Sequence, residues 1–222
     1  MTEGDQPHLE WATEGAVLLA QACPVLVVVD VLRFTTAVEV AVTHGARVVP
    51  ARWRGRETGG AGPYSLSPVS LLGIPSGTRL ELASPNGAMV AMAAAGAGAV
   101  VLAGCLRNAS AVAAATRRVG GPVGVVAAGE RRPDGSLRFA VEDLLGAGAI
   151  LTALGGRPSP EARAAIAVFL DAAPDLPATL ASCTSGRELV ARGLAADLDL
   201  AAGHDVSRTV PRLVGGAFAQ LS

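Results

Sequence analysis

Four residues able to bind charged ligands lie within one short segment of the chain: Asp30, Arg33, Thr35 and Thr36. The apolar run before them, 25–29, predicts a buried strand, and the run after them, 37–42, predicts a helix. In open α/β sheets, ligands bind where a strand gives way to a helix. A carboxylate there can hold a hard cation, and an arginine beside a helix N-terminus can hold an anion. The segment is therefore the first candidate for a binding or catalytic site.

Polar residues also follow two other predicted strands: Asn86 and Gly87 after 79–83, and Arg107 and Asn108 after 99–103. Backbone amides at the first of these junctions could cradle a phosphate group. The arginine at the second junction could face the same ligand. Each junction also has a simpler interpretation, because Asn-Gly is a common turn pair and asparagine is an ordinary helix cap.

A fourth cluster is acidic: Glu130 with Arg131 follows the strand predicted at 122–127, and Glu142 with Asp143 begins the helix predicted at 141–154. Two adjacent carboxylates beside a crevice are good Mg²⁺ ligands, either directly or through water. The helix macrodipole alone would also favour acids in a first turn. Similar alternatives apply to the first segment. Thr36 and Glu39 have the spacing of a capping box, and Asp30 with Arg33 could form a plain ion pair.

The composition excludes several kinds of chemistry. The chain has 222 residues and a formal net charge of −1, and its 18 lysine-or-arginine residues are all arginine. Without lysine there is no Schiff base, no phosphate-loop lysine and no lysine general base. A net charge near zero gives no electrostatic argument for binding nucleic acid or an anionic membrane. The strongly apolar composition favours a homodimer that covers a surface patch.

The three cysteines are widely spaced, at Cys23, Cys105 and Cys183. With no histidine nearby, they are expected to be buried small hydrophobes rather than a disulfide framework or a zinc site. The acidic and polar N-terminus does not have the features of a signal peptide, so a cytoplasmic location is the default expectation. The uncharged stretch 88–105 contains interrupting glycines, which favours a helix, a turn and a strand over a membrane span.

Strands and helices alternate through most of the chain. Strands are predicted at 25–30, 46–50, 79–83, 99–103, 122–127 and 137–139, and helices at 36–44, from about 86, at 108–119 and at 141–154. This alternation predicts a three-layer α/β/α fold around a largely parallel or mixed central sheet. The last third is expected to add helices from Ser159 and Ser185 that pack on the sheet, and a short strand at 197–200. Residues 1–222 are expected to form a single α/β domain, with any subdivision near 155.

Taken together, these junctions resemble the 2-phosphosulfolactate phosphatase family. The resemblance rests on Asp30-Val-Leu-Arg33-x-Thr35-Thr36, Asn86-Gly87, Asn108-Ala-Ser-Ala-Val112, Ala128-Gly129-Glu130, Glu142-Asp143, Gly146-Ala-Gly148, Ser185-Gly186 and Val210-Pro211. It implies a three-layer α/β/α fold and a Mg²⁺-dependent hydrolase of coenzyme M biosynthesis. The implied reaction converts (R)-2-phospho-3-sulfolactate to 3-sulfolactate and phosphate.

A mechanistic hypothesis for phosphate monoester hydrolysis gives each polar cluster a role. The expected Mg²⁺ ligands are Asp30, Glu142 and Asp143. The expected phosphate-binding groups are Arg33, Thr35, Thr36 and the amides of Asn86 and Gly87. Asn108 would orient the substrate, and Arg107 or Arg131 would bind its second anionic group. Glu130 or Asp30 would activate the attacking water, unless the Asp30 carboxylate itself attacks phosphorus.

Parts of the chain depart from the family pattern. In the excursion 52–77, the short segment 62–68 stands where the family has a longer segment with an acid and an asparagine. Phe34 replaces a small residue, and Ser84-Pro85 replace a Thr-Thr-like pair. These differences leave open an alternative from another class: a binding protein on the same scaffold that holds a phosphorylated or dicarboxylate metabolite without turnover.

Overall fold

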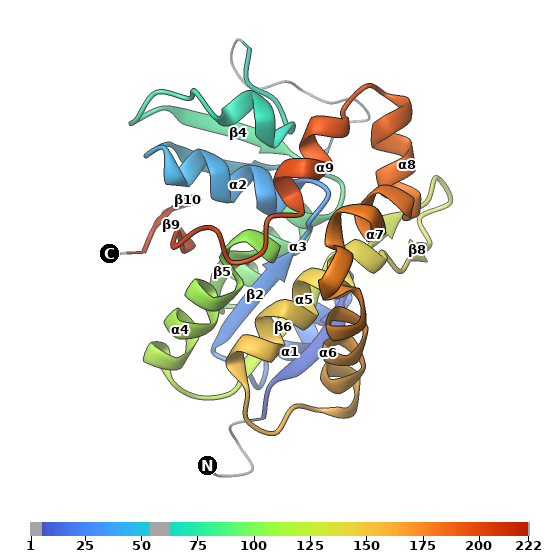
Figure 1. The fold of residues 1–222 in the computed structure, drawn as a ribbon. Helices are drawn as coiled ribbons and strands as arrows, with labels where there is room; N and C mark the ends of the chain where they lie inside the picture. The colour runs from blue at the N-terminus through green and yellow to red at the C-terminus, as the bar shows by residue number, and fades with distance from the viewer. Residues whose placement is uncertain (1–5, 54–62, 222) are drawn as a thin grey trace.

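The structure, a computed structural model, describes residues 6–53 and 63–221, and within them one large mixed sheet runs through the molecule (Figure 1). The order of its strands is β1-β6-β2-β5-β9-β10-β3-β4. Their bounds are β1 His8–Trp11, β2 Val25–Val29, β3 Arg47–Ala51, β4 Arg79–Ala83, β5 Val100–Gly104, β6 Val123–Ala127, β9 Pro211–Val214 and β10 Ala217–Gln220. A separate small hairpin pairs β7 (Glu130–Arg131) with β8 (Leu137–Arg138).

Helices cover both faces of this sheet. The helices are α1 Ala12–Leu19, α2 Phe34–Thr43, α3 Gly87–Gly96, α4 Ala109–Val119, α5 Val141–Leu154, α6 Pro160–Ala172, α7 Leu176–Ser182, α8 Thr184–Ala191 and α9 Ala195–Ala201. Successive β2 side chains alternate between two hydrophobic clusters, as the period of a strand requires. Val27 belongs to the cluster that includes residues of α4, α5 and α6, whereas Val28 belongs to the cluster that includes residues of α1, α2 and α3. The predicted three-layer α/β/α fold is confirmed.

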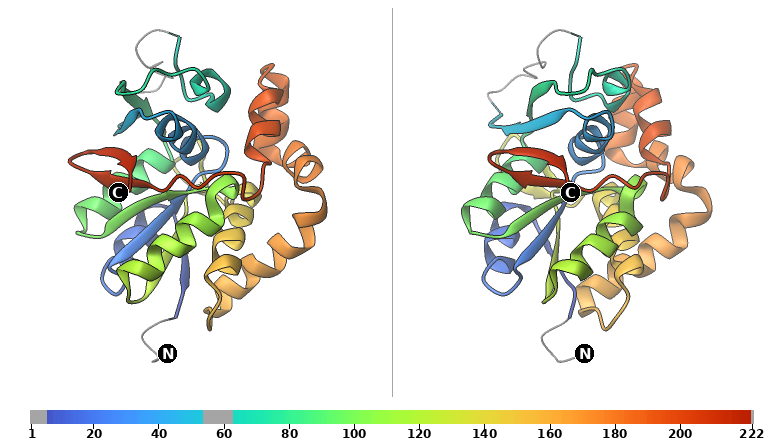
Figure 2. Two further views of the ribbon diagram at one scale, coloured as in Figure 1. Left: turned by 60° about the vertical axis from the view of Figure 1, so that its left-hand side comes forward. Right: turned by 90° about the vertical axis from the view of Figure 1, so that its left-hand side faces the viewer.

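The sheet has a parallel part and an antiparallel part. Strands β1, β6, β2 and β5 are parallel to one another, and β3 is parallel to β4. The hairpin β9–β10 lies between these two groups and is antiparallel to its neighbour on each side. Only one residue pair, Phe218 with Val48, joins β10 to β3. Figure 2 shows the hairpin in red beside the blue strand β3. The sheet is therefore mixed, one of the two arrangements expected.

The C-terminal third is helical, as expected, but its packing differs in part. Helix α5 lies on the sheet, and α6 packs mainly against α5 and more lightly against β1. Helices α7, α8 and α9 continue from α6 past the carboxyl end of β2 (Figures 1 and 2). The strand predicted at 197–200 is wrong, because this segment belongs to α9. One core cluster contains residues from Leu9 to Val210 and so joins both sides of position 155.

Two further expectations concern apolar segments. The stretch 88–105 forms α3, a turn and the buried β5, as predicted. Cys23, Cys105 and Cys183 are buried and free. One helical run in the described part of the chain, Pro160–Ser182, is long and apolar enough to cross a membrane by length and composition alone. Core helices of soluble proteins share that property, so this run supports no assignment to a membrane.

Candidate active site

Asp30 ties the ends of two strands together. It follows β2, and its Oδ2 accepts hydrogen bonds from the Gly87 amide at 2.7 Å and from Ser84 Oγ at 3.2 Å, both just after β4. Its Oδ1 accepts one from the Phe34 amide at 3.2 Å. A side chain at position 87 would not fit, because its Cβ would lie 2.6 Å from Asp30 Oδ2. Burial raises the pKa of Asp30, against the opposing effect of these hydrogen bonds.

Two more carboxylates enter from the first turn of α5. Asp143 Oδ1 accepts a hydrogen bond from the Val31 amide at 2.8 Å, and its Oδ2 accepts one from the Gly129 amide at 2.9 Å. These contacts attach α5 to the segments after β2 and β6. Burial first, and then the charges of Asp30 and Glu142, raise the pKa of Asp143 well above its ordinary value.

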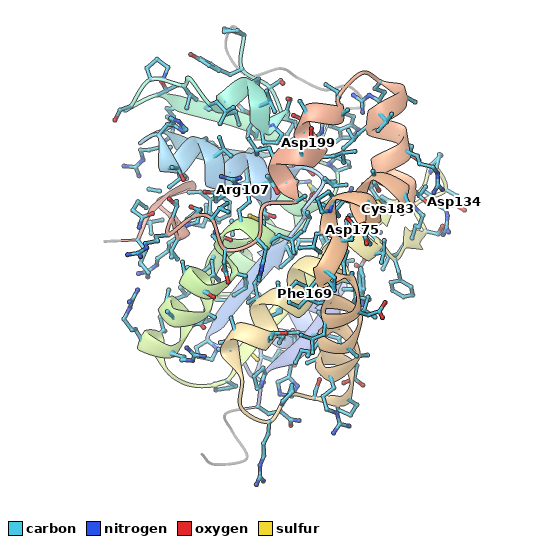
Figure 3. The ribbon with its side chains drawn as sticks, in the orientation of Figure 1. Arg107, Asp134, Phe169, Asp175, Cys183 and Asp199 are labelled. Carbon is cyan, nitrogen blue, oxygen red and sulfur yellow. The ribbon has the colours of Figure 1, made fainter. Side chains whose placement is uncertain are left out.

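Glu142 is the exceptional member of the acidic cluster. Its side chain is 1% exposed, and neither carboxylate oxygen accepts a hydrogen bond from a described residue. The thiol of Cys183 lies within its influence, since burial and then the Glu142 charge raise the pKa of that thiol to about 12. Figure 3 shows Cys183 where α7 gives way to α8. A buried carboxylate normally has ion-pair, hydrogen-bond or metal partners, so the Glu142 oxygens, with the weakly donating Cys183 thiol as their neighbour, indicate room for a cation.

Glu130 has a carboxyl group whose pKa lies near neutral pH. Asn86 Nδ2 donates a hydrogen bond of 2.7 Å to Glu130 Oε2, while Asn86 Oδ1 accepts one from the Arg131 amide. Burial, followed by the charge of Asp30, raises the pKa of Glu130 to about 7. The hydrogen bond from Asn86 and the charge of Arg138 act in the opposite direction. A carboxylate with this pKa can serve as a general base or acid.

Asp30, Asn86 and Glu130 border a cavity of about 220 Å³, whereas Glu142 and Asp143 lie behind its wall. Its polar lining consists of Asp30, Arg33, Ser84, Asn86, Glu130, Ser185, Glu188 and Arg192. Cationic and carboxylate side chains therefore line the same cavity, with Arg33 and Arg192 beside Asp30 and Glu130. Such a combination can bind an oxyanion and also position a water molecule.

Arg33 is held in this cavity by a buried ion pair. Its Nη1 lies 3.1 Å from Asp197 Oδ2 in α9, and the two side chains are 5% and 1% exposed. Asp197 Oδ1 also accepts hydrogen bonds from Ser67 Oγ at 2.5 Å and from the Val69 amide at 3.3 Å. Arg33 pairs with Asp197 rather than with Asp30, so the plain ion pair considered from the sequence is not formed.

The two threonines of the first segment hold its backbone. Thr35 Oγ1 donates to the Asp30 carbonyl and accepts from the Asp30 amide, and Thr36 Oγ1 donates to the Val31 carbonyl. Both side chains are fully buried. The capping box expected for Thr36 and Glu39 is wrong, because α2 begins at Phe34. The Gly87 amide expected to hold phosphate is already bonded to Asp30.

Three other predicted residues direct their side chains to partners away from the acidic cluster. Arg107 pairs with Glu39 at 2.6 Å beside α2 (Figure 3). The Asn108 side chain bonds backbone groups of residues 103, 105 and 209. The Arg131 guanidinium turns outward to Glu14 at 3.1 Å. The structure thus brings together Asp30, Arg33, Asn86, Glu130, Glu142 and Asp143, and leaves Arg107, Asn108 and the Arg131 side chain outside.

Sequence reasoning missed several residues at this site. No role at the site was predicted for Arg192, Ser84 or Ser185. Asp197 was assigned to a strand. A helix-capping signal explains the two serines equally well, so nothing in the local pattern could have separated them. The pairing of Asp197 with Arg33 spans 164 positions and follows from the fold alone.

Comparison with known families gives this arrangement a chemistry. A sequence model of 2-phosphosulpholactate phosphatase matches residues 62–216. The chain belongs to the 2-phosphosulpholactate phosphatase family. No protein in a search of curated proteins matches it. The family assignment makes the protein a phosphoric monoester hydrolase.

The matched part of this phosphatase contains Asn86, Glu130, Glu142 and Asp143. Asp30 and Arg33 precede it in the chain. The contacts from the Gly87 amide to Asp30 and from Asp143 to the Val31 amide join the earlier segment to the matched part. The phosphatase therefore builds its acidic cluster from both sides of the match boundary.

Proposed function

We propose that the protein is a Mg²⁺-dependent phosphatase that converts (R)-2-phospho-3-sulfolactate to 3-sulfolactate and inorganic phosphate. The observation that carries the proposal is the cavity lined jointly by Arg33, Arg192, Asp30 and Glu130. A small substrate with phosphate, carboxylate and sulfonate groups needs cations for binding and an enzyme carboxylate for activating water. Family membership supports a substrate of the sulfolactate type.

The two arginines would bind two of the three anionic groups of the substrate. Arg33 is fixed by Asp197 and lies three residues after Asp30, so it is placed to bind the phosphoryl oxygens. Arg192, at the end of α8, would bind the sulfonate in place of the Arg107 or Arg131 expected from the sequence. Arginine suits both groups because its planar guanidinium can bind two oxyanion oxygens at once.

Glu130 would be the general base. Its pKa of about 7 means that about half of the molecules carry the carboxylate form at neutral pH. That form would take a proton from water as the water oxygen attacks phosphorus and the substrate alkoxide leaves. Asp30 is less suited to attack, because its Oδ2 already accepts two hydrogen bonds and its Oδ1 accepts one. We therefore favour the water route over a covalent aspartyl-phosphate.

The acidic cluster has the chemistry to hold Mg²⁺. Glu142 offers two oxygens without a described hydrogen-bond donor, and Asp143 and Asp30 lie within its electrostatic range. Within the described residues no group of three side chains already converges as a metal cage. Mg²⁺ commonly completes its shell with water and substrate oxygens, so a partial set of protein ligands is sufficient. When bound, the cation would withdraw electron density from the phosphoryl group.

The direct test is phosphate release from (R)-2-phospho-3-sulfolactate, with and without Mg²⁺. We expect turnover that a chelator abolishes, and a much higher kcat/KM than for 2-phospholactate, which lacks the sulfonate. Arg192→Gln should remove most of that preference. Glu130→Gln should lower kcat by about 10²-fold or more, whereas the exposed control Glu14→Gln should not.

Two outcomes would contradict the proposal. One is full activity of Glu130→Gln, which would exclude this carboxylate as the base. The other is tight ligand-induced thermal stabilisation without release of phosphate from any small phosphoester, which would favour a binding protein on this scaffold.

A further inference from the structure

A group of arginines lies on the four neighbouring strands β9, β10, β3 and β4, outside the phosphatase cavity. Strand pairing places Arg212 of β9 opposite Ala219 of β10 and Arg47 of β3 opposite Arg79 of β4. Because Phe218 pairs with Val48 in an antiparallel register, the next residues, Ala219 and Arg47, also lie opposite each other. The result is a row across four strands with arginine at three of its positions.

The side chains of the three arginines of this row, Arg47, Arg79 and Arg212, form no hydrogen bond or ion pair with any described residue. Elsewhere in the same chain, arginines such as Arg33 and Arg107 have carboxylate partners. Glu81 follows Arg79 on the same strand but makes no ion pair with it. Like charges that face each other directly across strands destabilise a sheet. The row therefore carries positive charge that no described carboxylate neutralises.

A cavity marks the place where an anion would complete the row. It has a volume of about 230 Å³ and is lined by Arg47, Arg212, Ala219 and Val214, among others. Arg47 and Arg212 stand two strands apart, roughly 10 Å between backbones. The small side chain of Ala219 between them leaves room above the sheet. Two guanidinium groups of this length can converge on one small oxyanion from opposite sides.

We infer that Arg212 and Arg47, with Arg79 adding positive charge beside Arg47, form a binding site for small phosphate-bearing anions, separate from the active site. Inorganic phosphate and small phosphorylated metabolites share the required chemistry, which is a compact group with about two negative charges near neutral pH. The site uses bidentate guanidinium contacts and needs no lysine, which this chain lacks. This inference does not depend on the identity of the phosphatase substrate.

The test counts phosphate sites by isothermal titration with inorganic phosphate, without metal and at constant ionic strength. The double variant Arg47→Gln with Arg212→Gln is compared with the matched double variant Arg118→Gln with Arg163→Gln. The control pair removes two exposed arginines on other surfaces. We expect the wild-type protein to show a phosphate site that the first variant weakens at least about tenfold and the control variant retains.

Other measurements separate this result from the alternatives. The active-site variant Arg33→Gln should leave this phosphate site in place, which distinguishes it from the proposed catalytic cavity. Arg79→Gln should raise the thermal midpoint at low ionic strength without phosphate, because it relieves repulsion from Arg47. Equal phosphate binding by the two double variants would overturn the inference. Row-dependent binding of a short DNA duplex or anionic vesicles, with no binding of phosphate, would also overturn it.

Discussion

The hydrogen bond from Asn86 to Glu130 makes the pH dependence of the reaction a sharp test. The amide of Asn86 donates to Glu130 Oε2 at 2.7 Å and stabilises the charged carboxylate, whose pKa is about 7. Hydrogen bonds to charged groups are worth about 1.5–3 kcal/mol, and one pKa unit corresponds to about 1.4 kcal/mol. Because water can partly replace the lost donor, Asn86→Ala should raise the pKa of Glu130 by about one unit.

The sign and size of the effect follow directly. A general base acts in its deprotonated form, so kcat/KM should fall as the pH drops through about 7 in the wild-type protein. A shift of about one unit makes Asn86→Ala about tenfold slower at pH 6 but only about a tenth slower at pH 9. The ratio of the two rates is an internal control, since a loss of substrate affinity would lower both.

The assay is a profile of kcat/KM against pH for the wild-type protein, Asn86→Ala and Glu130→Gln. The acidic limb should move to higher pH in Asn86→Ala and disappear from the residual activity of Glu130→Gln. An unchanged limb in Asn86→Ala would refute the coupling between this amide and the base. A limb that persists in Glu130→Gln would show that another group titrates.

Three further predictions concern the buried charges. Glu142→Gln should abolish activity and leave the thermal midpoint of the metal-free protein equal or higher. The reason is that it removes a buried charge to which no described residue donates a hydrogen bond. A large loss of stability would contradict this account. The pKa values of Asp30 and Asp143 are raised, so the metal-free protein should lose stability as the pH rises through those values, and Mg²⁺ should restore it more at pH 8 than at pH 5 in calorimetry. Mg²⁺ stabilisation that is independent of pH would count against these carboxylates as ligands. Asp197→Asn should cost about 3–5 kcal/mol in chemical denaturation, since it removes the charge of a buried carboxylate that pairs with Arg33. A loss under about 1 kcal/mol would show that this ion pair contributes little to stability.

The sequence predicted those elements whose pattern is local. The run 25–29 is apolar and β-branched, and it forms β2. The helix predicted at 141–154 has those bounds in α5. Each of these segments is buried on the sides that its period requires, so periodicity was sufficient.

Some elements were predicted wrongly because the same short sequence pattern can occur in a strand and in a helix. Asp197-Leu-Asp-Leu200 alternates like a strand, but the segment is helix α9, with Asp197 turned inward to Arg33. The hairpin β9–β10 was not predicted, although Gly215-Gly216 between two short apolar runs is a hairpin signal. At β9, the initial proline and the short length concealed a strand.

The acidic cluster of the site was predicted better than its cations. Strand-to-helix junctions identify the end of the sheet at which side chains gather, and Asp30, Asn86, Glu130 and Asp143 were found in this way. Which arginine reaches the cavity depends on long side chains and on the helices that follow α5. Arg107 forms an ion pair with Glu39 and Arg131 forms one with Glu14, so neither side chain reaches the cavity. Arg192, at the end of α8, lines the cavity instead.

The position of the C-terminal hairpin in the sheet has a consequence for biosynthesis. β9–β10 follows every other described element in the chain, yet it fills the gap between β5 and β3. On the ribosome, a nascent chain that has already made Asp30 and Ser84 cannot close its sheet until residues 211–220 emerge. Such late, long-range closure slows folding and lengthens exposure of unpaired strand edges. The strands that carry Asp30 and Ser84 can therefore join in one complete sheet only after the hairpin has been synthesised.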